Sequence, residues 1–382
     1  MKSQTILSIH IQIENELKVT GEKNCVNMVR FNGEANSDFF SGIVLPGGVD
    51  TQMAVDGKTH LSARYMLEGK DLTGTPCRIF IENEADLTDD KIITVPKIIT
   101  DSKALAWLQY TELEGRIENE ANGICIHICE KLCDFERSEY IINKPGKVIH
   151  GEFYKPVNTN NKTPIVIASH GYNSSSLQMR YEMEELTKRG VACYCYDFCG
   201  GGVNSKSSGK TTEMTIPSEI NDLKFVYEEI SALPFIDKEN IYLYGMSQGG
   251  FVSALTAPDL KNNIKGLFLV FPAFCIPDDW ADRRKNNKDE IIEFGGMTLG
   301  RCFADELPDY DVFSYASNYE GDVFIFHGEC DPVVNVKYSE KLVKEYKNAE
   351  LSIYPRQQHW FESKFTIATS GKIARIINDN LR

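Results

Sequence analysis

The run IYLYGMSQGG at residues 241–250 places an apolar, strand-like segment directly before a G-x-S-x-G turn, and a helix is expected over residues 251–257. A sharp turn from strand to helix lifts a serine hydroxyl clear of the backbone. It also leaves the next N–H and the helix N-terminus close to a developing oxyanion. Side chains at Gly245 and Gly249 would collide with the neighbouring strand and helix. The pattern makes Ser247 the candidate nucleophile.

Two later loops supply the acid and the base that a nucleophilic serine needs. Asp331 follows the apolar run VFIF at residues 323–326, at the carboxyl end of a buried strand, where a doubly wound sheet places its ligand chemistry. His359 follows the next strand-like run, LSIY at residues 351–354. The chain order serine, aspartate, histidine is the order of α/β-hydrolases. We therefore predict that Asp331 orients His359 and that His359 is the base.

Three nearby titratable residues have other predicted roles. Glu329 competes with Asp331 for the acid role, although the family pattern H-G-x-x-D places the acid at Asp331. His170 and His327 are expected to be structural and to hold the loops that carry the chemistry.

Two backbone N–H groups are the candidate oxyanion donors. The strand-like run IVIAS at residues 165–169 is followed by HGYN at residues 170–173. An H-G turn at this place is the usual source of one donor, here the N–H of Tyr172. The other is the N–H of Gln248, directly after the nucleophile.

Bulk properties narrow the class of protein. A chain of 382 residues exceeds the size at which one core keeps growing, so two domains are expected. The formal net charge of −14 and the pI near 5.1 argue against nucleic acid or an anionic membrane as a partner. No signal-peptide pattern and no membrane-length apolar run is apparent. The 11 cysteines lie in apolar runs such as residues 193–195, as expected for reduced thiols of a cytoplasmic protein.

The only metal-like pattern is weak. Cys125, His127 and Cys129 alternate along a strand-like run and would face one side of it. No second ligand pair with standard spacing is near, so a structural role is favoured and no metal or other cofactor is predicted.

The two halves of the chain differ in character. Residues 1–134 contain many short alternating runs separated by Gly, Asn and Asp turns, which predict an all-β domain, with a closed barrel favoured over a sandwich. Residues 135–382 alternate buried strands with helices, the pattern of a mostly parallel α/β sheet. One helix is expected over residues 218–230, with Ser218 as its cap. Residues 158–162 are expected to form a surface loop.

An inserted cap is expected at about residues 272–320. This segment is rich in charge and in aromatic residues and lies between two predicted strands, where hydrolases of this class insert a lid over the serine. Trp280 and Phe274 within it, and Trp360 beside the candidate base, are predicted to line the substrate pocket. For any single cap aromatic, packing within the lid is an equally good explanation.

The stretch from about residue 139 to 382 resembles the bacterial cinnamoyl (feruloyl) esterase group of α/β-hydrolases, close to the serine aminopeptidase-like hydrolases. The resemblance rests on several motifs in one order, namely HGYN at 170–173, YDFCGGG at 196–202, SG at 208–209, EMT at 213–215, GMSQGG at 245–250, FPA at 271–273, HGECD at 327–331 and His359. It implies a Ser-His-Asp esterase with a covalent acyl-enzyme. One departure is the bulky Trp360, where relatives often have a glycine.

The first half resembles the domain-of-unknown-function 3237 family. The residues that carry this likeness are FNGEAN at 31–36, LPGGVD at 45–50, LSARYMLEG at 61–69 and CRIFIEN at 77–83. That family implies a small β-barrel and no secure activity. Asp50, Arg64, Tyr65 and Glu82 could line a ligand pocket, but structural pairing across strands is favoured.

These observations predict a serine carboxylester hydrolase acting on cinnamoyl, feruloyl or other small acyl esters. The expected partner is a small ester, such as a plant-derived hydroxycinnamate or an acylated sugar, and a homo-oligomer is left open. Two alternatives remain. One is a peptidase or amidase with the same three side chains, and the other is a hydrolase that a ligand- or partner-binding N-terminal barrel targets.

Overall fold

The computed structural model describes residues 2–87, 92–157, 162–286 and 289–381. Its contacts divide the chain into two compact units. The first contains Met1–Cys133 with Ser363–Arg375, and the second contains Asp134–Glu362 with Ile376–Arg382. The sequence prediction placed all of residues 135–382 in the second part. Of the loop expected at 158–162, only Lys162 lies among the described residues.

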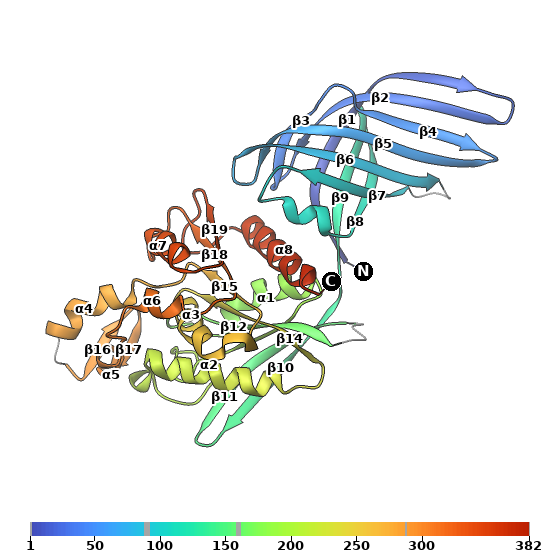
Figure 1. Ribbon diagram of the computed structural model, residues 1–382. Helices are drawn as coiled ribbons and strands as arrows, with labels where there is room; N and C mark the ends of the chain where they lie inside the picture. The colour runs from blue at the N-terminus through green and yellow to red at the C-terminus, as the bar shows by residue number, and fades with distance from the viewer. Residues whose placement is uncertain (1, 88–91, 158–161, 287–288, 382) are drawn as a thin grey trace. The chain divides into compact units, whose positions relative to one another are not determined.

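The part of the first unit that precedes residue 134 is an all-β sheet (Figure 1), as predicted. Its strands among the described residues are β1 (Lys2–Thr20), β2 (Asn24–Asn36), β3 (Phe40–Val44), β4 (Val49–Val55), β5 (Lys58–Asp71), β6 (Pro76–Leu87), β7 (Ile93–Thr100), β8 (Leu113–Glu120) and β9 (Gly123–Leu132). The short 3-10 helix η1 (Ala106–Tyr110) joins β7 to β8.

The strand pairings of this unit form a ring. The sheet order runs β1-β9-β8-β7-β6-β5-β3-β2-β4, and β1 also pairs with β2 while β5 also pairs with β4. Each pair in the ring is antiparallel. Alternate residues along each strand therefore point to the inside, as Ile79 and Ile81 do on β6, where both are fully buried.

The four polar residues singled out in this half have different environments. The Arg64 Nε atom lies 2.8 Å from the Glu82 Oε1 atom on the neighbouring strand, as the structural interpretation predicted. The ring of Tyr65 is buried and packs edge-on against Phe31 at 5.5 Å between centroids. Asp50 differs from the prediction, because it lines a cavity instead of pairing with a basic residue.

The second unit is built on a mostly parallel sheet, as the alternation of strands and helices predicted. Its described strands, in sheet order, are β10 (Phe135–Lys144), β11 (Lys147–Pro156), β13 (Ala192–Tyr196), β12 (Thr163–Ser169), β14 (Ile236–Met246), β15 (Gly266–Val270), β18 (Asp322–Gly328) and β19 (Ala349–Tyr354). Pairing is antiparallel from β10 to β13 and parallel from β13 to β19. The carboxyl ends of the parallel strands therefore meet at one edge.

Helices and short 3-10 turns connect these strands. The helices are α1 (Arg180–Thr187), α2 (Ile216–Ser231), α3 (Gln248–Leu260), α4 (Ile276–Asn286), α5 (Cys302–Asp305), α6 (Val312–Ala316), α7 (Lys337–Glu345) and α8 (Ser363–Asp379), with the 3-10 turns η2 (Ser176–Met179), η3 (Thr211–Glu213) and η4 (Lys261–Asn263). The contact division splits α8 between the two units. No helix of the described residues is both long and apolar enough to span a membrane.

The core lies between the sheet and its helices. Alternate strand residues such as Ile165, Ile167 and Leu243 join α2 and α3 in one buried cluster. Their sequence neighbours point to the other face, and α1 packs beside β11 and β13. The strands are buried on both sides, which explains why they read as continuous apolar runs.

Helix α2 begins two residues earlier than the sequence predicted. Its N-cap is Thr215, not Ser218. The Thr215 hydroxyl accepts a hydrogen bond from the Ser218 N–H, and the Ser218 hydroxyl accepts one from the Thr215 N–H. This reciprocal pair leaves Pro217 in the first turn, where its missing N–H costs nothing.

The segment after β15 forms a small insertion before β18. It holds α4, the hairpin of β16 (Ile291–Phe294) and β17 (Met297–Gly300), and α5, which gather in orange in Figure 1. Helix α6, which follows, packs against α3 of the central fold.

Candidate active site

The nucleophile candidate lies at a strained turn between β14 and α3. Ser247 has φ +53° and ψ −119°, a conformation that a residue with a side chain rarely adopts. Its N–H donates to the Val270 carbonyl at 3.0 Å, which fixes the turn to the next strand. A Cβ on Gly245 would lie 2.3 Å from the Gly249 oxygen, and one on Gly249 would lie 2.2 Å from the Ser169 oxygen. The two glycines are therefore required by close backbone packing.

The acid and base candidates are joined directly. The His359 Nδ1 atom lies 2.7 Å from Asp331 Oδ2, between the loops that follow β19 and β18. A carboxylate only accepts hydrogen bonds, so Nδ1 carries the proton and the neutral ring has a free lone pair on Nε2. Asp331 is 9 % exposed and His359 is 8 % exposed. This is the tautomer that a general base toward a serine hydroxyl requires.

Asp331 is held as an ion by several donors. Its Oδ1 accepts the N–H groups of Val333 at 2.8 Å and Val334 at 2.9 Å. His327 Nε2 lies 3.3 Å from Asp331 Oδ2 and donates to the Val334 carbonyl at 2.8 Å. Burial raises the pKa of Asp331, but the hydrogen bonds from His327, His359 and the Val334 N–H outweigh it and hold the pKa well below its usual range.

The end of β15 links the turn of Ser247 to His359. The Ser247 N–H binds the last residue of β15, and Phe271, the next residue, packs against the His359 ring at 4.2 Å between centroids. Among the described residues, no hydrogen bond joins the Ser247 hydroxyl to the imidazole. Catalytic hydrogen bonds are often long without substrate and tighten in the complex.

The loop of Tyr172 passes over the serine. A Cβ on Gly171 would lie 3.2 Å from the Ser247 Cβ atom. His170 fixes this loop, because its Nδ1 donates to the Gly171 carbonyl at 2.7 Å and its Nε2 accepts the Phe198 N–H at 3.0 Å. Burial lowers the pKa of His170, which agrees with a neutral ring. The N–H of Gln248 is in the first turn of α3, where helical N–H groups lack intrahelical partners.

The inserted hairpin binds the same loop. The Tyr172 hydroxyl donates to the Phe294 carbonyl at 2.7 Å, and the Asn173 side chain donates to the Gly295 carbonyl at 3.1 Å. The rings of Tyr172 and Phe294 meet edge to face at 5.4 Å. The insertion is thereby tied to the loop of Tyr172, which carries one candidate oxyanion donor.

The three predicted pocket aromatics have different surroundings. Trp280 is 2 % exposed and packs against Phe294 and Phe303. Phe274 is 1 % exposed and lies in the core of α3 and α6. Trp360 is 56 % exposed, and its ring lies 5.8 Å from that of His359. Of the three, Trp360 is the one that reaches the candidate base.

Sequence reasoning missed Glu219. The Gln248 side chain donates to Glu219 Oε2 at 2.8 Å, and the carboxyl is fully buried. Within the described chain its Oε1 atom has no partner. Burial raises the pKa of Glu219 to about 8, although the hydrogen bond from Gln248 opposes this. Its position four residues before Leu223 on the apolar stripe of α2 was the available signal.

Glu219→Gln is expected to change how stability depends on pH. The folded-state pKa of Glu219 lies above its unfolded value, so the folded protein binds the extra proton and loses stability as pH rises from about 4.5 to about 8. Glutamine does not titrate, so the variant should lose less stability as the pH rises through this range. Urea midpoints at several pH values measure this, with Glu228→Gln on the exposed face of α2 as control. Identical pH curves for all three proteins would contradict the expectation.

The predicted metal-like trio does not come together as one site. Cys125 and His127 are 4.0 Å apart, but the group of three potential ligands found among the described residues is His10, Glu120 and Cys125. His10 already pairs with Glu120 at 3.0 Å. This hydrogen bond accounts for their approach.

Comparison with known proteins relates each half to a family. Residues 160–300 match the family model described as serine aminopeptidase, S33. Residues 1–88 match the model described as protein of unknown function (DUF3237). A UPF0311 protein of Clostridium acetobutylicum is 32% identical over 89 residues, which make up 22% of this chain and 52% of that protein. The chain thus spans about half the length of this curated relative.

Several solved structures are similar to the C-terminal part of the chain. The structure of Est1E from Butyrivibrio proteoclasticus with ferulic acid bound has a TM-score of 0.58 at 24% identity, over 64% of this chain and 100% of that one. The structure of the DcsB complex with its substrate analogue has a TM-score of 0.52 at 18% identity, over 65% of this chain and 99% of that one. The structure of a hypothetical protein from Pseudomonas aeruginosa has a TM-score of 0.52 at 14% identity, over 64% of this chain and 94% of that one. Both resemblances expected from the sequence are confirmed: the C-terminal part has the α/β-hydrolase fold and matches the serine aminopeptidase S33 model, and the N-terminal part matches DUF3237.

Proposed function

We propose that this protein is a serine carboxylester hydrolase that works through a covalent acyl-enzyme. The observation that carries the proposal is the hydrogen bond from His359 Nδ1 to a buried, ionised Asp331, at the sheet edge where Ser247 occupies a strained strand-to-helix turn. A serine hydroxyl needs such an oriented base to become a nucleophile at neutral pH.

The proposed reaction has two stages. His359 Nε2 takes the Ser247 proton as the oxygen attacks the ester carbonyl, and the N–H groups of Tyr172 and Gln248 hold the oxyanion. The alcohol leaves with the proton from His359, and water then repeats the sequence to release the acid. Asp331 stabilises the imidazolium in both stages. No step requires a cofactor.

A substrate with an aromatic acyl group, of the cinnamoyl or feruloyl type, is proposed for two reasons. The half-exposed indole of Trp360 beside His359 offers a flat apolar surface on which an aryl group can stack. The α/β-hydrolase structure from Butyrivibrio proteoclasticus holds ferulic acid. Other small acyl esters remain within the proposal.

A peptidase or amidase is the second candidate, favoured by the serine aminopeptidase description of the model that residues 160–300 match. An amide has a poorer leaving group than an ester, so the imidazolium of His359 must protonate the leaving nitrogen as the bond breaks. The ratio of kcat/KM for methyl ferulate to that for an amino-acyl p-nitroanilide separates the two. A higher value for the anilide would favour the amidase.

Covalent labelling tests the serine chemistry itself. Incubation with a fluorophosphonate is expected to abolish hydrolysis of p-nitrophenyl acetate. It should also add the mass of one phosphonyl group to the peptide that contains Ser247. Mass spectrometry of the digested protein locates the adduct. Activity that survives complete modification of Ser247 would place the chemistry elsewhere.

A reducing compartment, the cytoplasm, is proposed as the location. All 11 cysteines are outside disulfides, and 7 of them are buried. Thiol titration of protein purified without reductant tests this, because disulfides formed in the cell would lower the count below 11.

A further inference from the structure

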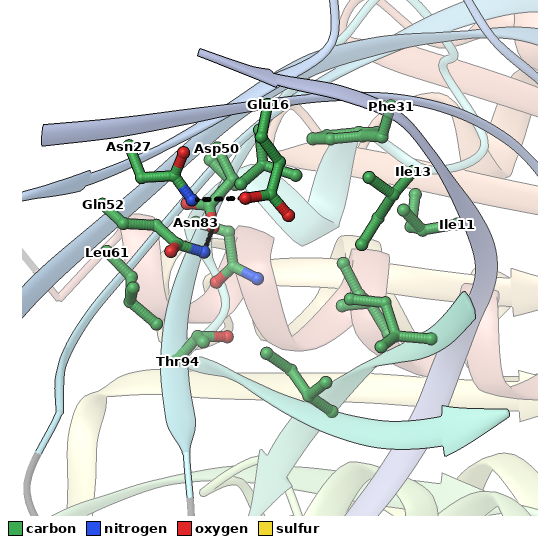
Figure 2. A pocket seen from close by; sticks show the side chains of 15 residues that line it. Ile11, Ile13, Glu16, Asn27, Phe31, Asp50, Gln52, Leu61, Asn83 and Thr94 are labelled. Carbon is green, nitrogen blue, oxygen red and sulfur yellow. Dashed lines mark hydrogen bonds between the residues drawn. The ribbon is translucent and has the colours of Figure 1, made fainter. Parts of the chain in front are cut away.

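The nine-stranded sheet of the first unit lines a partly open cavity (Figure 2). Its volume is about 160 Å³, and 15 residues line it. An engineered apolar cavity of about 150 Å³ in another protein admits benzene. The space in this unit therefore suits one ring and a few further atoms. All lining residues belong to the first unit, so the cavity is independent of the candidate active site.

The two sides of the cavity differ in chemistry. In Figure 2 the side chains of Asn27, Gln52 and Asn83 gather on one side, while Ile11 and Phe31 lie on the other. A molecule that fills the space would meet apolar surface along its body and polar groups at its head. Small-molecule sites commonly combine an apolar wall with a few placed polar groups.

Two fully buried polar groups in the lining have no partner. Asn83 and Thr94 are each 3 % exposed, and the Asn83 Oδ1 and Thr94 Oγ1 atoms make no hydrogen bond to any described residue. A buried polar atom without a partner costs about 1–3 kcal/mol, and native structures contain few of them. Both side chains line the same cavity, so one occupant could satisfy both.

Two further oxygens of the lining are left free by the internal hydrogen bonds. Asn27 Nδ2 donates to Glu16 Oε2 at 3.1 Å, and Gln52 Nε2 donates to Asp50 Oδ2 at 2.8 Å, as the dashed lines in Figure 2 show. The Asn27 Oδ1 and Asp50 Oδ1 atoms remain without a partner within the described part of the chain. Because a carboxylate can only accept, the missing partner must be a donor.

A bulge in β1 turns an acidic side chain toward this cavity. Ile11 and Ile13 face it, and simple alternation would bring Asn15 next. The register with β2 shifts between Ile13 and Asn15, so Glu16 faces the cavity instead. Bulges commonly re-aim a side chain beside a functional site.

The charge of the lining favours a cation. Glu16 and Asp50 are acidic, and none of the 15 described lining residues is lysine, arginine or histidine. An anion would be repelled, whereas an ammonium group offers three donors and a favourable charge. Ile13 and Glu16 are exposed and mark where the cavity opens.

We propose that this cavity is a binding site for a small primary amine with a ring-sized apolar body. The ammonium group donates to the free oxygens of Asp50 and its neighbours, and the ring packs against the isoleucines of β1 and β9. The site lies in the first unit of the chain, and it does not depend on the proposed esterase activity.

Binding to the full chain tests the proposal with four probes of one ring each. Benzylamine is expected to bind, and toluene, benzyl alcohol and benzoate are expected to bind about tenfold more weakly or not at all. None of these three carries a positive charge, and toluene and benzoate also lack a hydrogen-bond donor. Calorimetry measures the affinities. Methyl NMR of labelled isoleucine locates the site, since Ile11, Ile124 and Ile126 line it.

Paired variants distinguish the site from adventitious binding. Asp50→Asn keeps the acceptor for Gln52 but removes the charge, and Thr94→Val keeps the shape but removes a free hydroxyl. Both should weaken benzylamine binding, by about tenfold for Asp50→Asn. Thr94→Val should leave the melting temperature of the free protein unchanged or higher, because it removes an unpartnered buried group.

Matched controls lie outside the cavity. Thr51 is on β4 between the lining residues Asp50 and Gln52, and Asp38 is exposed between β2 and β3. Neither residue lines the cavity, so Thr51→Val and Asp38→Asn are the controls. Both should bind benzylamine as the unaltered protein does. Equal affinity for benzylamine and toluene, or an affinity that Asp50→Asn and Thr94→Val leave unchanged, overturns the proposal. Benzyl alcohol binding as tightly as benzylamine overturns the assignment of a cation.

Discussion

Ser247→Ala is expected to lower kcat for small aryl esters by roughly 10⁶-fold, to the residual rate that the oxyanion donors alone provide. The substitution removes the only atom proposed to form the acyl bond, and it leaves the backbone at φ +53° as it was. The fold should therefore persist, with a melting temperature close to that of the unaltered protein. Stopped assays with methyl ferulate and p-nitrophenyl acetate measure the loss.

A matched control lies six residues further along the chain, inside helix α3. Ser253 is fully buried, and among the described residues its hydroxyl has no hydrogen-bond partner. Ser253→Ala therefore removes a hydroxyl without removing an interaction and should keep kcat within about twofold. Loss of activity in this control, or hydrolysis that Ser247→Ala leaves intact, would refute the assignment of the nucleophile.

The elements around Ser247 could be predicted because their signals are local. The apolar runs before 245 and 327 are strands β14 and β18, since residues buried on both faces of a parallel sheet must be apolar throughout. The start of α2 was predicted two residues late, because two hydroxyls share the cap and the sequence alone does not say which residue precedes the first turn.

The contacts between distant segments could not be predicted. Glu219 contacts Gln248 because α2 packs against α3. The hairpin of β16 and β17 contacts Tyr172 because two loops that are far apart in the sequence meet, and no local sequence pattern predicts such a meeting. In the first half, Arg64 and Glu82 pair across strands as expected. Asp50 does not, because the ring of strand pairings turns its side chain toward the cavity instead of a neighbour of opposite charge.

Asp331→Asn is expected to lower kcat about 10⁴-fold by reversing the tautomer of His359. The N–H groups of Val333 and Val334 both require an acceptor at the Oδ1 position, so the asparagine carbonyl must lie there. Its NH₂ group then faces His359 Nδ1 and needs a lone pair on that atom. The proton moves to Nε2, and the ring can no longer accept from Ser247.

The pH dependence of kcat and a control variant at Glu329 test whether the changed tautomer of His359 causes the loss. The pKa of Asp331 lies well below its usual range because His327, His359 and the Val334 N–H outweigh its burial, so the acid is ionised at every pH of the assay. The loss in Asp331→Asn should therefore be similar from about pH 5 to 9. Glu329→Gln is the control, because Glu329 is exposed and, among the described residues, its side chain accepts only from the Arg356 N–H at 3.3 Å. It should retain kcat within about twofold. The opposite ranking of these two variants would make Glu329 the orienting acid.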